Sequence, residues 1–266
     1  MPAGTYLMGD ALGDGYRADG EQPVHPVSLP DFEIDATTVT VAAFAAFATA
    51  TGYITDAERF GASAVFQASA SAPGTPVDGT PWWRTVPGAD FRTPGGPGSV
   101  ALDEHPVVHV SYTDALAYCG WAGRALPTEA QWEYAARGGL ESARYPWGNE
   151  HPAPGERCHI FTGSFPDAPT GPVGTIPAQS FAPNGYGVYQ AVGNVWEWCS
   201  DRYSARYYRV SPTDSPGGPD RGTARVLRGG SHLCHDSYCY RYRVAARSRN
   251  TPSSSASNIG FRTVSG

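Results

Sequence analysis

The sequence predicts a single α+β domain with a low content of regular secondary structure. The 266 residues include 32 glycines and 24 prolines, roughly twice their combined average share in proteins. They are spread without a period, which excludes a collagen-like repeat or a flexible linker. Hydrophobic residues make up 41% and charged residues 17%, a balance typical of a folded globular protein. We therefore expect one domain over residues 1–266, with short elements joined by long loops.

Three short helices are predicted from their capping residues. Thr40 can cap a helix that ends at Gly52. Capping boxes at Ser111–Asp114 and Thr128–Gln131 open two more helices, which stop at Gly123 and at Gly138-Gly139. Between them, these helices account for only a small part of the chain.

Short strands are predicted at Thr5–Gly9, Val24–Ile34, Val192–Trp198 and Arg225–Gly230. Residues 67–104 are rich in Gly, Pro, Ala and Ser and are predicted to form a long surface loop. The pair Trp82-Trp83 inside that loop is either a plug in the core or part of a binding face. Base rates for large aromatic side chains favour the plug.

Charge and hydropathy exclude several classes of function. The net charge is −6, all 19 basic residues are arginine and no basic run is present, so nucleic-acid binding has no support. The chain start has neither a basic nor an apolar signal region, and the longest apolar stretch, 39–50, is too short to span a bilayer. The five cysteines are an odd number, typical of a reducing compartment. We expect a cytoplasmic protein without membrane contacts.

Cys234 and Cys239, which follow the Gly-Gly-Ser stretch at 229–231, are the sharpest local feature. Spacing alone favours a disulfide that closes a small loop. A zinc site with His235 needs further ligands, and no second Cys or His pair has a similar spacing. A third possibility is a two-thiolate site for Cu(I), a soft ion that soft thiolates select. The spacing leaves all three open.

Glu197 lies in the aromatic stretch 193–198, which is typical of a packed strand with buried tryptophans. A buried carboxylate needs a partner. That partner could be a hard cation such as Ca²⁺, bound together with backbone carbonyls, or an arginine. The arginines near the C-terminus are expected on a solvated or salt-bridged strand; they are Arg241, Arg243, Arg247 and Arg249.

Four longer stretches form recognisable motifs. They are Leu126–Tyr134, Gly193–Trp198, Arg228–Ser231 running into Cys234 and Cys239, and Arg243–Arg262. Together with Gly4–Gly9 and His105–Ser111, they make essentially the whole chain resemble the formylglycine-generating enzymes, also called sulfatase-modifying factors. The first two motifs are shared by a wider superfamily, whereas the paired cysteines in the Gly-Gly-Ser context mark the formylglycine-generating branch.

This resemblance implies a C-type-lectin-like α+β fold with little regular secondary structure. It implies a copper-dependent oxidase that uses O₂ to convert a cysteine into Cα-formylglycine. The substrate would be a Cys-x-Pro-x-Arg segment of an unfolded sulfatase, which the modification activates. The resemblance also implies Cu(I) and Ca²⁺ as cofactors, and we expect a monomer.

Carried onto this chain, the resemblance implies that Cys234 and Cys239 bind Cu(I), with the substrate thiol as a third ligand. The positions that line the oxygen and copper pocket are matched by Ser231, Trp196 and Tyr238. Asn258 matches a position near the substrate peptide.

One family calcium site is matched by the Gln190 side chain, the carbonyls of Gly193 and Val195, and Glu197. The other fits poorly. His159 stands where an Asn ligand is expected, beside the carbonyl of Ile160, and the loop 171–174 lacks the expected Asp.

Two other functions compete with this one. An iron-dependent sulfoxide synthase of the same superfamily would need a histidine cluster, typically on an added helical domain, and none of the seven histidines forms a helical His-x-x-x-His pair. A non-catalytic lectin-like binding module would not need two cysteines beside Gly-Gly-Ser, so we place it second.

Overall fold

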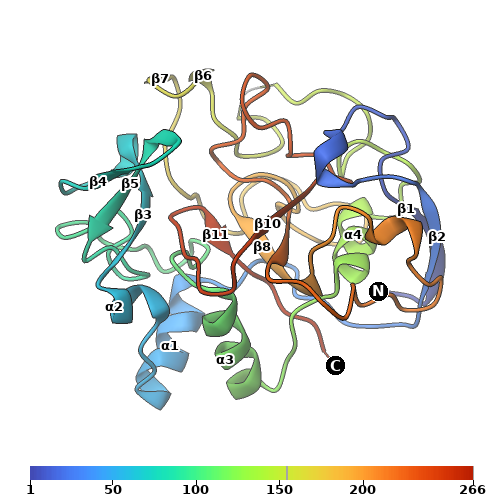
Figure 1. Cartoon of the computed structure of the whole chain (residues 1–266), viewed down its shortest axis with the longest axis horizontal. Helices are drawn as coiled ribbons and strands as arrows, with labels where there is room; N and C mark the ends of the chain where they lie inside the picture. Colours follow the sequence, from blue (N-terminus) through green and yellow to red (C-terminus); the bar gives the residue numbers. More distant parts are fainter. Residues whose placement is uncertain (154, 266) are drawn as a thin grey trace.

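The computed structural model describes residues 1–153 and 155–265, which contain four α-helices and several small sheets around one central sheet (Figure 1). The helices are α1 (Val41–Thr51), α2 (Asp56–Phe60), α3 (Tyr112–Ala122) and α4 (Glu129–Arg137). The strands are β1 (Gly4–Met8), β2 (His25–Leu29), β3 (Ala62–Phe66), β4 (Thr75–Val77), β5 (Thr80–Pro87), β6 (Gly163–Ser164), β7 (Ala168–Pro169), β8 (Trp196–Arg202), β9 (Arg225–Arg228), β10 (Arg247–Asn250) and β11 (Ile259–Gly260). Long irregular segments join them, as the composition predicts.

The central sheet has the strand order β10-β9-β8-β11, antiparallel except for the parallel pair β8 and β11. A second sheet, β3-β5-β4, lies on one side of it near α1, α2 and α3 (Figure 1). The hairpin of β1 and β2 lies on the other side, next to α4. The backbone of Ala64 on β3 accepts a hydrogen bond from Ser257 at 2.9 Å, which ties the second sheet to the segment before β11.

The predicted helix starts are confirmed by their capping bonds. The Thr40 hydroxyl accepts from the Ala43 amide at 3.3 Å, and α1 ends at Gly52. Ser111 and Thr128 both form complete capping boxes, with Asp114 and Gln131 as their partners. These residues satisfy amide groups that a helix start leaves without an internal acceptor.

Several predicted boundaries are wrong. Residues 67–104 are not one loop, because they contain β4 and β5, which pair with β3. A short helix, α2, was not predicted although Thr55 and Glu58 form a capping box. The strand predicted at 192–198 begins later and runs on to Arg202. The strand predicted at 24–34 is confined to His25–Leu29.

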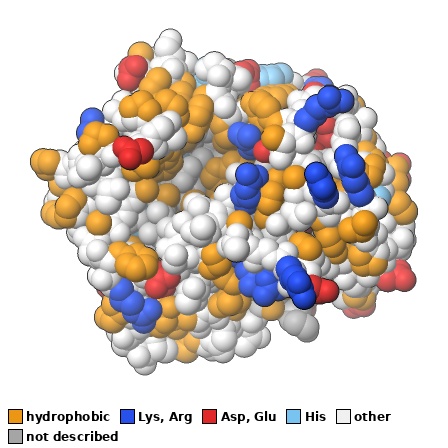
Figure 2. Space-filling view, in the orientation of Figure 1, with side chains coloured by type: hydrophobic (Ala, Val, Ile, Leu, Met, Phe, Trp, Pro, Cys, Tyr) orange, Lys and Arg blue, Asp and Glu red, His pale blue; other side chains and the backbone are white. Residues whose placement is uncertain are grey.

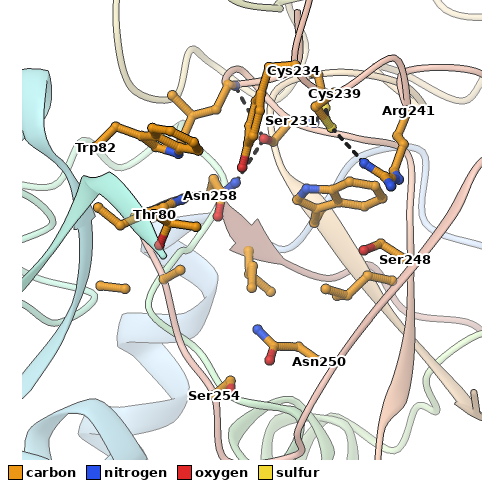
Figure 3. Close-up of a pocket in the computed structure, with 18 of the residues that line it drawn as sticks. Thr80, Trp82, Ser231, Cys234, Cys239, Arg241, Ser248, Asn250, Ser254 and Asn258 are labelled. Carbon is orange, nitrogen blue, oxygen red and sulfur yellow. Dashed lines mark hydrogen bonds between the residues drawn. The ribbon is translucent and has the colours of Figure 1, made fainter. Parts of the chain in front are cut away.

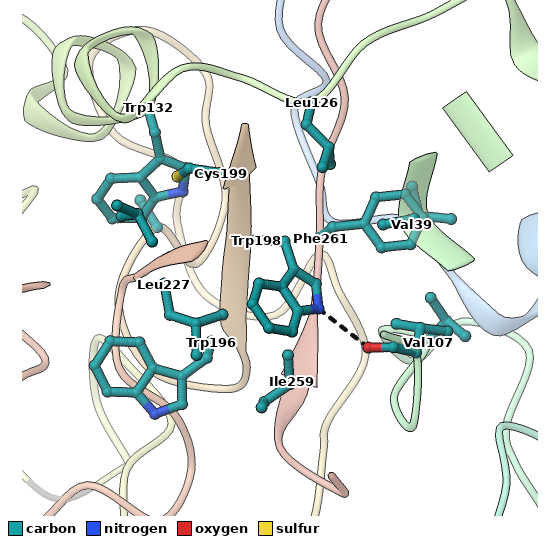
Figure 4. Close-up of a cluster of buried hydrophobic side chains, with 14 of the residues drawn as sticks. Val39, Val107, Leu126, Trp132, Trp196, Trp198, Cys199, Leu227, Ile259 and Phe261 are labelled. Atoms are coloured by element: carbon teal, nitrogen blue, oxygen red, sulfur yellow. Dashed lines mark hydrogen bonds between the residues drawn. The ribbon is translucent and has the colours of Figure 1, made fainter. Parts of the chain in front are cut away.

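The main apolar core fills the space between the central sheet and the helices (Figure 4). Trp132 and Trp198 are almost completely buried there, and the indole N–H of Trp198 donates to the Val110 carbonyl at 3.1 Å. A buried indole needs such an acceptor to avoid the cost of an unpaired donor. The core therefore fixes strand β8 relative to the loop before α3.

Buried arginines hold the irregular segments together. Arg228, Arg247 and Arg262 are each at most 1% exposed, and each pairs with a buried glutamate. Each also donates to loop carbonyls that no strand partner satisfies; Arg228, for example, reaches the carbonyls of Val244 and Ala245. Because buried carbonyls must be hydrogen-bonded, these side chains replace part of the missing regular structure. Of the arginines predicted on a solvated or salt-bridged strand, Arg247 lies on β10 and pairs with Glu129, whereas Arg241 and Arg243 form ion pairs outside the described strands.

No helix within the described residues is long and apolar enough to cross a membrane. All five cysteines are buried and free of disulfide bonds.

Candidate active site

A cavity of about 630 Å³ opens between the central sheet and the β3-β5-β4 sheet. On the surface it forms a hollow bordered by hydrophobic side chains on one side and by arginines on the other (Figure 2). All six residues that the sequence places at a copper and substrate site line this cavity; they are Cys234, Cys239, Ser231, Trp196, Tyr238 and Asn258. The structure therefore brings together residues from three separate stretches of the chain.

Two glycines allow the cysteine loop to approach the rest of the site closely. Gly229 and Gly230 have φ values of 93° and 71°, in the region that favours glycine. A Cβ atom on Gly230 would lie 2.9 Å from the Arg241 carbonyl oxygen. The glycines thus let the start of the loop lie against its end, so that both cysteines face the same cavity.

The cysteine loop, residues 231–239, consists of two consecutive turns. The Cys234 amide donates to the Ser231 carbonyl at 2.9 Å, and the Cys239 amide donates to the His235 carbonyl at 2.7 Å. The two sulfur atoms are 2.8 Å apart, with one thiol as the hydrogen-bond donor to the other. The residues are only 1% and 7% exposed.

The three interpretations left open by spacing can now be compared. The two cysteines are free thiols, so the structure does not contain the disulfide. His235 hydrogen-bonds to Ser237, and the described part of the chain contains no cluster of three or more His, Cys, Asp and Glu side chains that could hold a metal ion. A zinc or histidine-iron site thus lacks ligands. Two soft thiols remain, and they suit Cu(I).

Charge distinguishes the two thiols. The hydrogen bond with Cys234 lowers the pKa of Cys239, and the nearby Arg241 guanidinium lowers it further. Burial raises the pKa of Cys234 well above its usual value, and the neighbouring Cys239 adds to this. In the metal-free pair Cys239 is therefore the more acidic of the two thiols.

The cysteines elsewhere behave differently. Burial raises the pKa of both Cys119 and Cys158 to about 12, and that of Cys199 well above its usual value. Only the thiolate is a good nucleophile and metal ligand. The cavity therefore holds the one cysteine, Cys239, whose pKa the surroundings lower.

Ser231 and Asn258 form a polar pair at the thiol end of the cavity (Figure 3). The Ser231 hydroxyl oxygen accepts from the Asn258 side-chain amide at 2.9 Å and from the Leu233 backbone amide at 3.3 Å. With its oxygen accepting twice, the hydroxyl proton is available to a group bound in the cavity. Asn258 thus orients Ser231 in addition to facing the cavity itself.

Trp82, Phe165 and Tyr238 form an aromatic cluster over the thiols. The Tyr238 ring stacks on Phe165 with centroids 4.4 Å apart, and Trp82 meets Tyr238 edge-on at 5.0 Å. Trp83 packs on Phe66 and also lines the cavity. The sequence left Trp82-Trp83 either as a plug in the core or as part of a binding face. The structure shows features of both, because both tryptophans pack against neighbours and both border the cavity.

The far end of the cavity is polar and was not predicted. Its hydroxyl and amide side chains come from β5, β10 and the loop before β11; they are Thr80, Ser248, Asn250, Ser254 and Ser255. Small polar residues in loops carry no sequence signal for a site. The pairing of β10 with β9 in the central sheet brings Ser248 and Asn250 to the cavity.

The residues expected to bind calcium lie outside this cavity, in the segment that leads into β8. Gln190 donates to the Pro177 carbonyl at 2.7 Å, while its buried Oε1 atom has no hydrogen-bond partner among the described residues. Glu197 is fully buried, and Arg262 binds both of its carboxylate oxygens at 2.6 and 2.8 Å. Of the two partners considered for Glu197, the structure contains the arginine.

The second, poorly matched calcium site is occupied by protein contacts. His159 Nε2 lies 2.7 Å from the Gly174 carbonyl oxygen, and its ring stacks on His232 with centroids 5.9 Å apart. Burial lowers the pKa of His159. A neutral imidazole thus binds the 171–174 loop directly.

Fold and site together define a single-domain protein that presents two thiols in a cavity between small sheets. The family model for the "Sulfatase-modifying factor enzyme 1-like domain" matches residues 1–266, and the chain belongs to this family. It is 58% identical to the "Formylglycine-generating enzyme" of Streptomyces coelicolor, over 98% of this chain and 87% of that protein. It is 42% identical to the mouse "Inactive C-alpha-formylglycine-generating enzyme 2", over 100% of this chain and 84% of that protein.

Among solved structures, PvdO from Pseudomonas aeruginosa superposes with a TM-score of 0.73 at 25% identity, over 99% of this chain and 92% of that one. The predicted α+β fold with little regular secondary structure is thereby confirmed.

Proposed function

We propose that this protein is a formylglycine-generating enzyme. It oxidises a cysteine in a Cys-x-Pro-x-Arg segment of a client sulfatase to Cα-formylglycine, using O₂ and Cu(I) bound by Cys234 and Cys239. The observation that carries the proposal is the pair of adjacent free thiols at one end of an open cavity. The activity named for the Streptomyces relative supports it, and so does the family.

The donor set fits Cu(I). Both donors are soft sulfurs, both are almost fully buried, and none of the described residues that line the cavity carries a hard carboxylate. When bound, the copper would supply the redox chemistry that brings O₂ and the client thiol together. Both thiols give up their protons when the metal binds, and the lowered pKa of Cys239 makes this easier at that sulfur.

In the proposed reaction O₂ accepts four electrons, two of them from the client cysteine. The client cysteine loses two electrons and two protons to become a thioaldehyde, and water then replaces the sulfur, which leaves as H₂S. O₂ accepts these two electrons and two more from a pair of external thiols, which become a disulfide, and is reduced to water. The Ser231 hydroxyl donates to a group bound beside the thiols, and the aromatic cluster limits the access of water to it.

The polar end of the cavity suits an extended peptide. Hydroxyl and amide side chains such as Ser248 and Asn250 can pair with the backbone of a bound strand. An unfolded client loses conformational entropy on binding, which restricts the affinity. The protein would act as a monomer, and its five free cysteines support a cytoplasmic location.

A peptide assay tests the proposal. The reduced, copper-loaded protein is incubated under O₂ with a peptide containing Cys-x-Pro-x-Arg, and the product is followed by mass spectrometry. We expect a copper-dependent mass loss that matches replacement of the thiol by an aldehyde. Cys234→Ala and Cys239→Ala should abolish it, whereas Cys119→Ala, which alters a buried thiol outside the cavity, should not.

Absence of conversion by a protein that binds Cu(I) would overturn the proposed reaction on this peptide. Absence of both conversion and Cu(I) binding would overturn the enzyme proposal and leave the binding module.

We also propose a structural Ca²⁺ site formed by the side chain of Gln190, the carbonyls of Gly193 and Val195, and Glu197. Amide, carbonyl and carboxylate oxygens are the ligands that Ca²⁺ prefers. The support is the buried and unpaired Oε1 atom of Gln190. A chelator should therefore lower the Tm of the wild-type protein, and added Ca²⁺ should restore it. In Gln190→Ala the chelator should have a smaller effect; an equal effect in both proteins would contradict this site.

A further inference from the structure

We propose that Asp19 and Arg241 form a positioning pair of the copper site. Arg241 places a fixed positive charge beside the Cys239 sulfur, and Asp19 holds Arg241 in that position. The inference rests on the proposed Cu(I) site at Cys234 and Cys239. It assigns a role to a segment near the N-terminus for which the sequence indicated none.

Arg241 reaches the cysteine pair from the side of the cavity opposite Trp82 (Figure 3). Its Nη1 atom lies 4.0 Å from Cys239 Sγ, within the range of a hydrogen bond to sulfur. The side chain also lines the cavity and keeps 26% of its surface exposed. The guanidinium therefore acts on one of the two sulfurs, Cys239, from the cavity side.

Three contacts fix the orientation of Arg241. Its Nε atom donates to Asp19 Oδ2 at 2.5 Å, and Nη2 donates to Asp19 Oδ1 at 3.3 Å. The guanidinium lies over the Tyr16 ring, 4.4 Å from its centroid. Tyr16 is anchored in turn, because its hydroxyl accepts from the backbone amide of Tyr240 at 3.1 Å.

Asp19 is itself well placed, since its side chain is only 8% exposed. Its backbone carbonyl accepts from the Tyr203 hydroxyl at 2.9 Å. Gly20, at φ 68°, packs so closely on Ala205 that an added Cβ would lie 2.2 Å from the Ala205 carbonyl oxygen. The segment 16–20 thus forms a rigid support for Arg241.

The charge of Cu(I) explains why such a support is useful. Two thiolates and one Cu(I) carry a net charge of −1, and an uncompensated charge in a buried site is unfavourable. The cysteines are almost fully buried, and the Arg241 guanidinium, which stays protonated, compensates that charge. Residues that support metal ligands from outside typically change the metal affinity by about 10- to 100-fold when they are replaced.

The neighbouring ion pair shows that Arg241 is not merely a structural arginine. Arg243 binds Glu21 through both Nη atoms at 2.8 and 2.9 Å, is 1% exposed and contacts no sulfur. Arg241, two residues earlier, differs in facing the cavity and Cys239. Both arginines pair with an acidic residue of the segment 19–21, but of the two it is Arg241 that hydrogen-bonds to a cysteine sulfur.

Cu(I) affinity without any peptide tests the inference. The full-length reduced protein competes anaerobically with a chromophoric Cu(I) chelator, and circular dichroism verifies folding of each variant. Arg241→Gln should weaken Cu(I) binding by about 10- to 100-fold, and Arg241→Lys should restore part of the loss. Arg249→Gln is the matched control, because Arg249 lines the same cavity but lies over Tyr203; its Cu(I) affinity should equal that of the wild type.

Asp19→Asn tests the support separately. It should weaken Cu(I) binding less than Arg241→Gln does and cause no further loss when both substitutions are combined, because Asp19 acts through Arg241. Equal affinity of Arg241→Gln and wild type would overturn the inference and leave the proposed function intact if the peptide is still converted. An equal loss in Arg249→Gln would also overturn it. Absence of Cu(I) binding by the wild type would overturn both proposals.

Discussion

The two walls of the cavity are held in place by different forces. The sheet wall, formed by β8–β11 and the cysteine loop, is anchored by ion pairs such as Arg228 with Glu133, both fully buried. The hairpin wall, formed by β3, β4 and β5, is anchored by aromatic contacts and backbone pairing. A nearby ion pair on that side, Arg92 with Glu58, is largely exposed on its arginine. Buried charges fix the wall that holds the thiols, and apolar contacts shape the opposite wall.

The largest effect should come from breaking the anchors of the sheet wall. Arg228→Met removes one of the two arginine partners of Glu133, the other being Arg137, and takes a donor from the carbonyls of Val244 and Ala245. Removing one member of a buried ion pair costs about 3–5 kcal/mol. We expect a loss of this size in the free energy of unfolding, measured with urea.

Arg92→Met is the matched control on the other side of the molecule. An exposed pair contributes about 0–1 kcal/mol, so this variant should unfold almost like the wild type. Similar losses in the two variants would show that the two walls are not anchored differently.

A smaller loss of stability should occur at acid pH, because His109 forms hydrogen bonds that hold the hairpin wall in place. Fully buried His109 contacts the Ser63 hydroxyl and the Pro94 carbonyl, both at 2.8 Å. Burial lowers its pKa from 6.5 to about 4, so the unfolded chain binds the proton first as the pH falls. The contribution to stability is complete above pH 6.5 and decreases toward pH 4. One such group amounts to about 2 kcal/mol between pH 8 and pH 5.

The measurement is the urea midpoint at pH 8 and pH 5. His109→Gln should be less stable than the wild type at pH 8. Between pH 8 and pH 5, however, its stability should decrease by less than that of the wild type. Buried His159 and His232 act in the same direction, so some pH dependence should remain. If the variant loses as much stability between pH 8 and pH 5 as the wild type, His109 is not a cause of the pH dependence.

The smallest effect should come from the aromatic cluster. Trp82→Ala removes the ring that meets Tyr238 and Phe165, and a lost aromatic contact of about 1–1.5 kcal/mol corresponds to roughly a tenfold loss in kcat/KM for the client peptide. Cu(I) affinity should not change, because Trp82 is not one of the proposed Cu(I) ligands. Trp82→Phe should retain most activity. If Cu(I) affinity fell together with kcat/KM, the division of tasks between the two walls would be wrong.

Local signals predicted much of the fold. Capping residues such as Thr40 and Thr128 fixed the helix starts because a cap is a contact between near neighbours. The same argument would have found α2, since Thr55 and Glu58 form the same motif. Strand β5 was missed because Pro81 and the surrounding glycines indicate a loop, and only its pairing with β3 makes it a strand.

The site was predicted through family motifs rather than geometry. Spacing alone could not choose between a disulfide and a metal site at Cys234 and Cys239. Contacts such as Arg241 with Asp19 and Arg243 with Glu21 join residues 222 positions apart. No periodicity connects such positions, so the support of the cysteine loop became visible only in three dimensions.

These long-range contacts set an order of events during synthesis. A ribosome produces residues 16–21 before the two cysteines, and Asn258 after them. Until these parts meet, both thiols are open to solvent and to the oxidants of the cell. Closing a loop this long slows folding. The cysteine pair therefore reaches its final geometry late in folding. Copper delivered to the nascent chain would not find the proposed Cu(I) site already formed.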